Sequence, residues 1–170
     1  DGDIAHKTEV GAVELDLRDA DALRAVCAAM TAAKDGFLVQ PMLKGGIELV
    51  VGIKRDPQVG PVLLVGLGGV LVEIMRDTAL ALAPVGKAEA RRMLERLKGF
   101  KLLQGYRGTP AADLDAVCEA IARISEFAAD FADQVEEVDV NPLLARADGA
   151  VALDALIVLR EQFLRPRARG

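Results

Sequence analysis

Several residue types that mark particular kinds of protein are scarce in this sequence. Tryptophan is absent, histidine and tyrosine occur once each, and Cys27 and Cys118 are the only cysteines among 170 residues. The two cysteines lie far apart in alanine-rich helical patterns, so their spacing supports neither a disulfide framework nor a zinc site. We expect both thiols to be reduced and packed.

Positive charge is also in deficit. The chain has 21 Lys and Arg against 26 Asp and Glu, a formal net charge of −5, which argues against sequence-independent binding of nucleic acid because such binding needs a basic face. No apolar run reaches the roughly 18 to 20 residues of a membrane span, and no opening segment resembles a signal peptide. We therefore expect a cytoplasmic protein that binds neither nucleic acid nor membrane.

Hydrophobic residues make up 52% of the chain, and their spacing switches between strand and helix patterns. Strands are predicted at residues 11–17, 37–42, 47–56 and 61–67, further β structure within 70–84, and two strands within 136–159. Helices are predicted at 18–34, capped by Asp19 or Asp21, at 87–99, ended by Gly99, and at 113–132, capped by Asp113. This order predicts an α+β fold with a meandering, largely antiparallel sheet.

The last two predicted strands contain Asp and Asn, which strands usually avoid. Asp148-Gly149 is a strong hairpin dipeptide, and a tight turn there sets a register in which Asn141 faces Leu156. Asp154 then lies diagonal to Asn141 across the hairpin.

Side chains two apart on a strand share a face, so Asp139, Asn141 and Asp154 are expected to project from the same side of the sheet. Their oxygens could meet at one cation, and oxygen ligands of this kind suit Mg²⁺. Pro142 removes a ladder hydrogen-bond donor and fits an irregular point of a sheet, where a ligand can approach. The alternative is that the three residues line a solvated face.

Five stretches occur in a particular order along the chain: DIAHKTEVG, LVQPMLKGGIELVVGIKRDPQVGP, GLGGVLVEIMRD, LLQGYRGTP and VDVNPLLARADGAVALDA. Together they extend from residue 3 to about residue 159. Their order resembles the ATP-grasp domain of the ADP-forming acyl-CoA synthetases, relatives of the β subunit of succinyl-CoA synthetase. The resemblance implies an α+β ATP-grasp fold with an incomplete small lobe, and Mg²⁺ with ATP or ADP as cofactors.

The resemblance also implies roles for single residues. Asn141 and Asp154 match the two Mg²⁺ ligands of the family, in agreement with the shared face expected from the register. Asp139 matches an acidic residue, usually Glu, that meets the phosphorylated histidine of the catalytic partner domain. Asp is shorter than Glu, so its reach toward that histidine is reduced.

On the nucleotide side, Gln40 and Leu43 match the hinge whose backbone holds the adenine. Glu48 matches an acidic residue beside the nucleotide sugar and phosphates. The GLGG run at residues 66–69 has two interpretations, a phosphate cradle or a turn at the end of a strand.

The single histidine, His6, lies in HKTEVG. This segment resembles the one in which ADP-forming acetyl-CoA synthetases carry a second phosphohistidine, which implies that His6 relays a phosphoryl group to ADP. Lys7 could offset the charge of that group. Composition alone would make His6 an exposed surface residue.

Some parts of the family are missing from this sequence: a strand before Asp1 with a phosphate-binding lysine, and the CoA-binding and ligase domains that carry the primary catalytic histidine. We therefore predict the C-terminal larger part of an ATP-grasp domain, inactive alone and partnered by those domains in an oligomeric enzyme. Residues 1–39 would be the small-lobe remnant, 40–162 the large lobe and 163–170 a tail.

The activity implied for the complete protein is that of an acid–CoA ligase (ADP-forming). Two other hypotheses remain open at this stage. One is a ligand-binding regulatory module of a protein acetyltransferase, and the other is an assembly subunit that only docks a catalytic chain. The acyl group is not indicated, because acyl specificity belongs to the ligase module.

Overall fold

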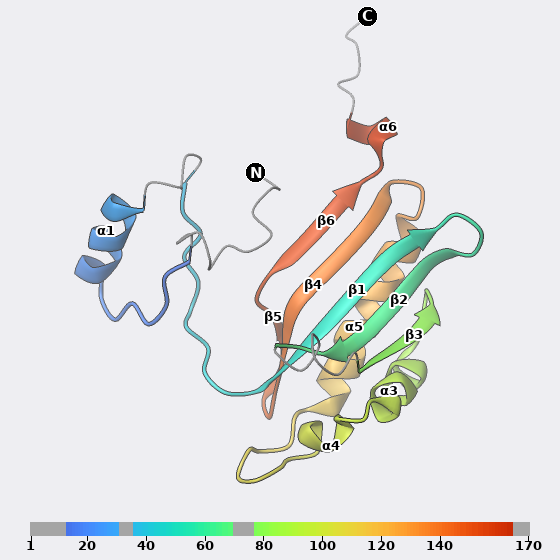
Figure 1. The fold of residues 1–170 in the computed structure, drawn as a ribbon, viewed down its shortest axis with the longest axis horizontal. Helices are drawn as coiled ribbons and strands as arrows, with labels where there is room; N and C mark the ends of the chain where they lie inside the picture. The colour runs from blue at the N-terminus through green and yellow to red at the C-terminus, as the bar shows by residue number, and fades with distance from the viewer. Residues whose placement is uncertain (1–12, 31–35, 70–76, 165–170) are drawn as a thin grey trace, which may run out of the picture. The chain divides into compact units, whose positions relative to one another are not determined.

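A computed structural model describes residues 13–30, 36–69 and 77–164 of the chain (Figure 1). The chain forms two compact units, residues 1–44 and residues 45–170. The larger unit contains the sheet and most of the described helices.

The described part of the first unit contains one helix, α1 (Ala20–Ala29). Asp19 precedes it in an extended conformation, and its carboxylate accepts the backbone N–H groups of Asp21 at 3.0 Å and Ala22 at 2.8 Å. These two bonds satisfy donors that the first turn of a helix leaves without partners. Of the two capping residues that the sequence allowed, Asp19 is the cap.

The two strands predicted in this unit are wrong over their described residues. Residues 13–18 and 36–44 form no regular structure, although both segments have strand-like composition. A strand needs a neighbour for its backbone N–H and C=O groups. The described residues of this unit include no strand that could supply them.

The second unit is built on a six-stranded sheet in which all the pairings are antiparallel (Figure 1). Its strands are β1 (Ile47–Asp56), β2 (Gly60–Leu67), β3 (Thr78–Leu82), β4 (Val135–Arg146), β5 (Gly149–Ala152) and β6 (Ala155–Leu159). The order is β3-β2-β1-β4-β5, and β6 also pairs with β4. The predicted strands at 47–56 and 61–67 are confirmed. The two strands predicted within 136–159 are three, because residues 153 and 154 interrupt the second one and divide it into β5 and β6.

Four helices are described after β3. Three lie between β3 and β4: α3 (Lys87–Arg96), the four-residue α4 (Phe100–Leu103) and α5 (Leu114–Asp130). The short α6 (Glu161–Leu164) follows β6. Asp113 caps α5 as predicted, since its carboxylate accepts the N–H of Ala116 at 3.0 Å. Among the described residues, none of the helices has both the length and the apolar character to cross a membrane.

The helix predicted at 87–99 ends earlier, at Arg96. The reason lies in Asp77, whose buried carboxylate accepts the backbone N–H groups of Lys98 and Gly99 at 2.8 Å each. Gly99 also packs so closely on Leu67 that any side chain there would collide with it. These contacts turn the chain out of α3 before it enters α4.

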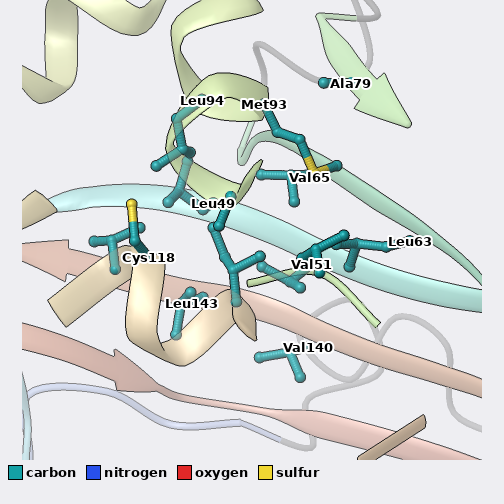
Figure 2. Close-up of a cluster of buried hydrophobic side chains, with 14 of the residues drawn as sticks. Leu49, Val51, Leu63, Val65, Ala79, Met93, Leu94, Cys118, Val140 and Leu143 are labelled. Carbon is teal, nitrogen blue, oxygen red and sulfur yellow. The ribbon is translucent and has the colours of Figure 1, made fainter. Parts of the chain in front are cut away.

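Helices α3 and α5 lie on one face of the sheet, and the core fills the space between them and the strands (Figure 1). Figure 2 shows Leu49 and Val51 of β1 packed with residues of β2, β4, α3 and α5. Cys118 of α5 belongs to this core, and burial raises the pKa of its thiol. Both cysteines are free, as predicted, although Cys27 is only partly buried.

Candidate functional site

The sheet has a second face, opposite α3 and α5, which we call the open face. Along β1 the residues Leu49, Val51 and Ile53 point into the core, and the alternate residues, such as Glu48 and Lys54, point to the open face. The strands thus place their fully buried aliphatic side chains on one face, whereas the open face carries charged side chains together with exposed leucines of β3 and β6.

The hairpin of β4 and β5 has a different register from the predicted one. Its turn consists of Ala147 and Asp148, and Arg146 pairs with Gly149. The guanidinium of Arg146 donates to the two carboxylate oxygens of Asp148 at 2.8 and 3.0 Å, which fixes Asp148 inside the turn. The prediction placed the turn at Asp148-Gly149. It is therefore wrong, and each residue of β4 pairs with a residue two positions earlier in the chain than predicted.

This correction brings the proposed metal ligands closer together in register. The same pairing continues into β6, where Asp139 pairs with Leu156, so Asn141 lies opposite Asp154 and not opposite Leu156. The backbone N–H of Asn141 donates to the carbonyl of Asp154 at 3.2 Å. A shift of two residues keeps every side chain on its face, and directly opposite residues are closer than diagonal ones.

Strand β4 is irregular at this point. Leu49 and Val51 of β1 pair with Leu143 and Val140 of β4, so the dipeptide Asn141-Pro142, whose peptide bond is cis, is left opposite one residue of β1. Bulges of this kind are frequent beside functional sites because they redirect a side chain. Across the hairpin, the carboxylate of Asp154 accepts the N–H of Ala155 at 3.0 Å, which restrains its orientation.

Three carboxylates lie near one another on the open face. Burial raises the pKa of Asp139 above its ordinary value, and the negative charges of Glu137 and Asp154 raise this pKa further. Lys54 of β1 partly offsets this concentration of negative charge, since its Nζ is 3.5 Å from Glu137 Oε2. Glu137 is not among the site residues predicted from the sequence. It could have been found, because residues two apart on a strand share a face and Glu137 lies two residues before Asp139.

The donor set at this place fits Mg²⁺ bound together with phosphate. In the part of the chain that the structure describes, no group of three or more His, Cys, Asp or Glu residues could hold a metal ion. Asn141 and Asp154 offer amide and carboxylate oxygens, and Mg²⁺ commonly takes one or two carboxylates, several waters and substrate phosphates. A protein-only metal cage is not what these residues form.

Glu48 lies at the beginning of β1, on the open face and exposed. The backbone N–H of Gly68, directly after β2, donates to the Glu48 carbonyl at 2.6 Å. Of the two interpretations of the GLGG run, its described part therefore has the form of a turn at the end of a strand. Residues 70–76 lie outside the described part of the chain.

The remaining predicted site residues are not among the described residues of the second unit. Gln40 is exposed and Leu43 partly buried, in the irregular segment 36–44 of the first unit. His6 falls outside the described residues. The structure thus brings Asp139, Asn141 and Asp154 together, with Glu48 on the same face of the same unit.

Comparison with known proteins gives a consistent result. Residues 1–159 match the model of the ATP-grasp domain. The chain is 37% identical over 168 residues to acetate–CoA ligase [ADP-forming] I of Archaeoglobus fulgidus, covering 94% of this chain and 24% of that protein. It is 34% identical to acetate–CoA ligase [ADP-forming] I subunit beta of Pyrococcus furiosus, covering 92% of this chain and 71% of that subunit. The chain thus spans about a quarter of the length of the first relative.

A solved structure is also similar to this chain, at a comparable sequence identity. Acetyl-coenzyme A synthetase 1 of Ca. Korarchaeum cryptofilum, described as dinucleotide forming and in complex with coenzyme A and Mg-AMPPCP, superposes with a TM-score of 0.83 at 35% identity. The match covers 94% of this chain and 73% of that one. In that structure a phosphohistidine segment points towards the nucleotide binding site.

Proposed function

Because the chain belongs to the ATP-grasp domain family, we propose that it is the nucleotide-binding part of an ADP-forming acyl-CoA synthetase. Such an enzyme interconverts acyl-CoA, ADP and phosphate with a carboxylic acid, CoA and ATP. The observation that carries this proposal is the match over residues 1–159 to the ATP-grasp domain, joined to CoA ligases as relatives at 34 and 37% identity. These relatives favour a ligase over a regulatory module of a protein acetyltransferase.

The open face would bind the phosphate end of the nucleotide. Asn141 and Asp154 would hold Mg²⁺, which when bound neutralises charge on the nucleotide phosphates. Glu48 would lie beside the sugar and phosphates, and the backbone of Gln40 and Leu43 would hold the adenine. The proximity of Asn141 to Asp154 and the oxygen chemistry of both side chains support this assignment.

Phosphoryl transfer would pass through His6. A phosphoryl group on the imidazole moves to a terminal phosphate oxygen of ADP, so a P–N bond breaks, a P–O bond forms, and the histidine returns to its neutral state. Asp139 would contact the phosphorylated histidine of the catalytic partner domain. The phosphohistidine segment of the Ca. Korarchaeum cryptofilum synthetase, which points towards its nucleotide site, supports a relay of this kind.

The complete enzyme would also need parts besides the ATP-grasp domain. We propose CoA-binding and ligase domains that carry the primary catalytic histidine, on the same chain or on a separate subunit, within an oligomer. Residues 1–39 would be a remnant of the small lobe, 40–162 the large lobe and 163–170 a tail. The existence of both a long ligase and a separate subunit beta among the relatives supports either arrangement.

The test is phosphorylation of the complete enzyme with Mg-ATP, or with acyl-CoA and phosphate. An acid-labile phosphoryl group is expected on His6, and His6→Asn should keep the fold while lowering acyl-CoA-dependent ATP synthesis by orders of magnitude, because it removes the nucleophile. Peptide mapping locates the group, and thermal unfolding checks the fold. Near wild-type activity of His6→Asn would refute the relay.

A further inference from the structure

We infer that Gly68 and Gly69 are positioning residues for Glu48. A side chain at position 68 would meet the backbone and Cβ of Glu48, and a side chain at position 69 would meet its carboxylate. The inference rests on the proposed function, in which Glu48 lies beside the nucleotide. It assigns to the GLGG run a task different from holding phosphate.

Gly68 lies against the backbone of Glu48. A Cβ at residue 68 would be 2.7 Å from the Cβ of Glu48, 2.9 Å from its carbonyl carbon and 3.0 Å from its carbonyl oxygen. Separations this short are not tolerated between non-bonded heavy atoms, and the neighbour here is backbone that cannot simply rotate away. Any other residue at position 68 would displace the start of β1 and Glu48 with it.

Gly69 lies against the carboxylate of Glu48. A Cβ at residue 69 would be 3.2 Å from Glu48 Oε2, closer than ordinary van der Waals contact, so the carboxylate would have to move by a few tenths of an ångström. Gly69 also has φ +64, in the left-handed region that favours glycine. The first glycine therefore allows the close approach of the Glu48 backbone, and the second leaves room for the observed position of its carboxylate.

The hydrogen bond between these segments argues against a phosphate cradle at Gly68. A cradle works through backbone N–H groups that point at the anion. The N–H of Gly68 already donates to the carbonyl of Glu48 at 2.6 Å. The same bond ties the turn to β1, so it supports the positioning role.

The chain provides a matched control for Gly69 at the opposite end of β2. Gly60 also has a left-handed φ, +86, but a Cβ there would meet nothing within 4 Å. Gly69→Ala and Gly60→Ala therefore carry a comparable backbone strain, and only Gly69→Ala meets Glu48. In the complete enzyme, Gly69→Ala should raise the Kd of Mg-ADP about tenfold, and Gly60→Ala should leave it within about twofold of wild type.

A second comparison separates positioning from general damage to the fold. If Gly69 acts through Glu48, then in a Glu48→Gln background Gly69→Ala should cost much less further nucleotide affinity, while its effect on thermal unfolding stays the same. Equal losses of affinity with and without Glu48 would overturn the inference. So would a Kd for Gly69→Ala equal to that of Gly60→Ala.

Crystal structures of the variants keep the inference separate from the proposed function. In Gly69→Ala the carboxylate of Glu48 should be displaced, and in Gly60→Ala it should stay. An undisplaced carboxylate in Gly69→Ala overturns the positioning role whether or not nucleotide binds. Failure of the wild-type enzyme to bind Mg-ADP would instead refute the proposed function, and the displacement would still decide the positioning role.

Discussion

The two faces of the sheet are made by alternate residues of the same strands, yet they differ in composition, exposure and charge. The covered face is aliphatic and closed by α3 and α5, with Leu49, Leu63 and Val65 fully buried. The open face carries Glu48, the carboxylates near Asp139, and leucines that remain exposed. Because neighbouring residues of a strand point to opposite faces, residues that stabilise the core alternate with residues that are available to bind a ligand.

The strongest test of this separation introduces the same charge on each face. Leu49→Asp should prevent folding, because an unpaired carboxylate in the core costs more than about 5 kcal/mol, a large part of the stability of a small domain. Leu80→Asp is the matched control, since Leu80 points to the open face and is 58% exposed. Circular dichroism and urea unfolding measure both variants.

Leu80→Asp should fold and unfold close to wild type. If it were as damaging as Leu49→Asp, the open face would be buried in the folded protein and the comparison would fail.

The next test concerns activity at the open face. Asp154→Ala should lower the turnover of the complete enzyme by about two orders of magnitude, because it removes a proposed ligand of the ion that neutralises the phosphates. Its fold should change little, since Asp154 is exposed. Asp148→Ala, at the exposed tip of the same hairpin, is the control and should retain activity.

Excess Mg²⁺ sharpens this test. A weakened metal site should be partly rescued at high Mg²⁺ concentration, and full activity of Asp154→Ala at low Mg²⁺ would contradict its assignment as a ligand.

A smaller effect is expected where a buried and a partly buried aspartate make the same kind of hydrogen bonds. Asp77, 5% exposed, and Asp56, the last residue of β1, each accept two backbone N–H groups. Asp77→Ala should lower the free energy of unfolding by about 1–3 kcal/mol, because it leaves partly buried backbone donors without this partner. Asp56→Ala should cost less than about 1 kcal/mol, because water can replace the carboxylate. Similar losses in the two variants would show that burial does not decide the cost.

The smallest effect is expected in a test that leaves the sequence unchanged and measures how accessible the Cys118 thiol is in the core. Cys118 is 3% exposed and burial raises the pKa of its thiol, whereas Cys27 is partly exposed. A raised pKa means less thiolate at pH 8, so iodoacetamide should modify Cys27 well before Cys118. Mass spectrometry follows both rates, and denaturant should remove the difference. Fast modification of native Cys118 would mean that the covered face opens.

Much of the fold was predictable from local patterns. Local sequence is sufficient to predict the helix caps at Asp19 and Asp113 and the strands β1 and β2, because each depends on residues only a few positions apart. The strands predicted at 11–17 and 37–42 failed where they are described, because a strand depends on a partner that its own sequence does not specify.

Features that depend on distant residues were missed for a physical reason. Asp77 ends α3 from about twenty residues away along the chain, and no local pattern indicates such a contact. The hairpin turns at Ala147 and Asp148 and not at the Asp148-Gly149 dipeptide that the common turn preference indicates. A shift of two residues preserves the face of each side chain, so the prediction that Asp139, Asn141 and Asp154 share a face does not depend on this error.

The position of β1 between β2 and β4 has a consequence for how the chain folds. β1 can pair with β2 at once through a short turn, but its other edge pairs with β4, which follows only after residues 57–134. Closing so long a loop is entropically costly and slow. A nascent chain that has reached β3 therefore has a three-stranded meander with one edge of β1 unpaired, and this edge can recruit other chains. Folding during synthesis should be aggregation-prone until β4 emerges from the ribosome.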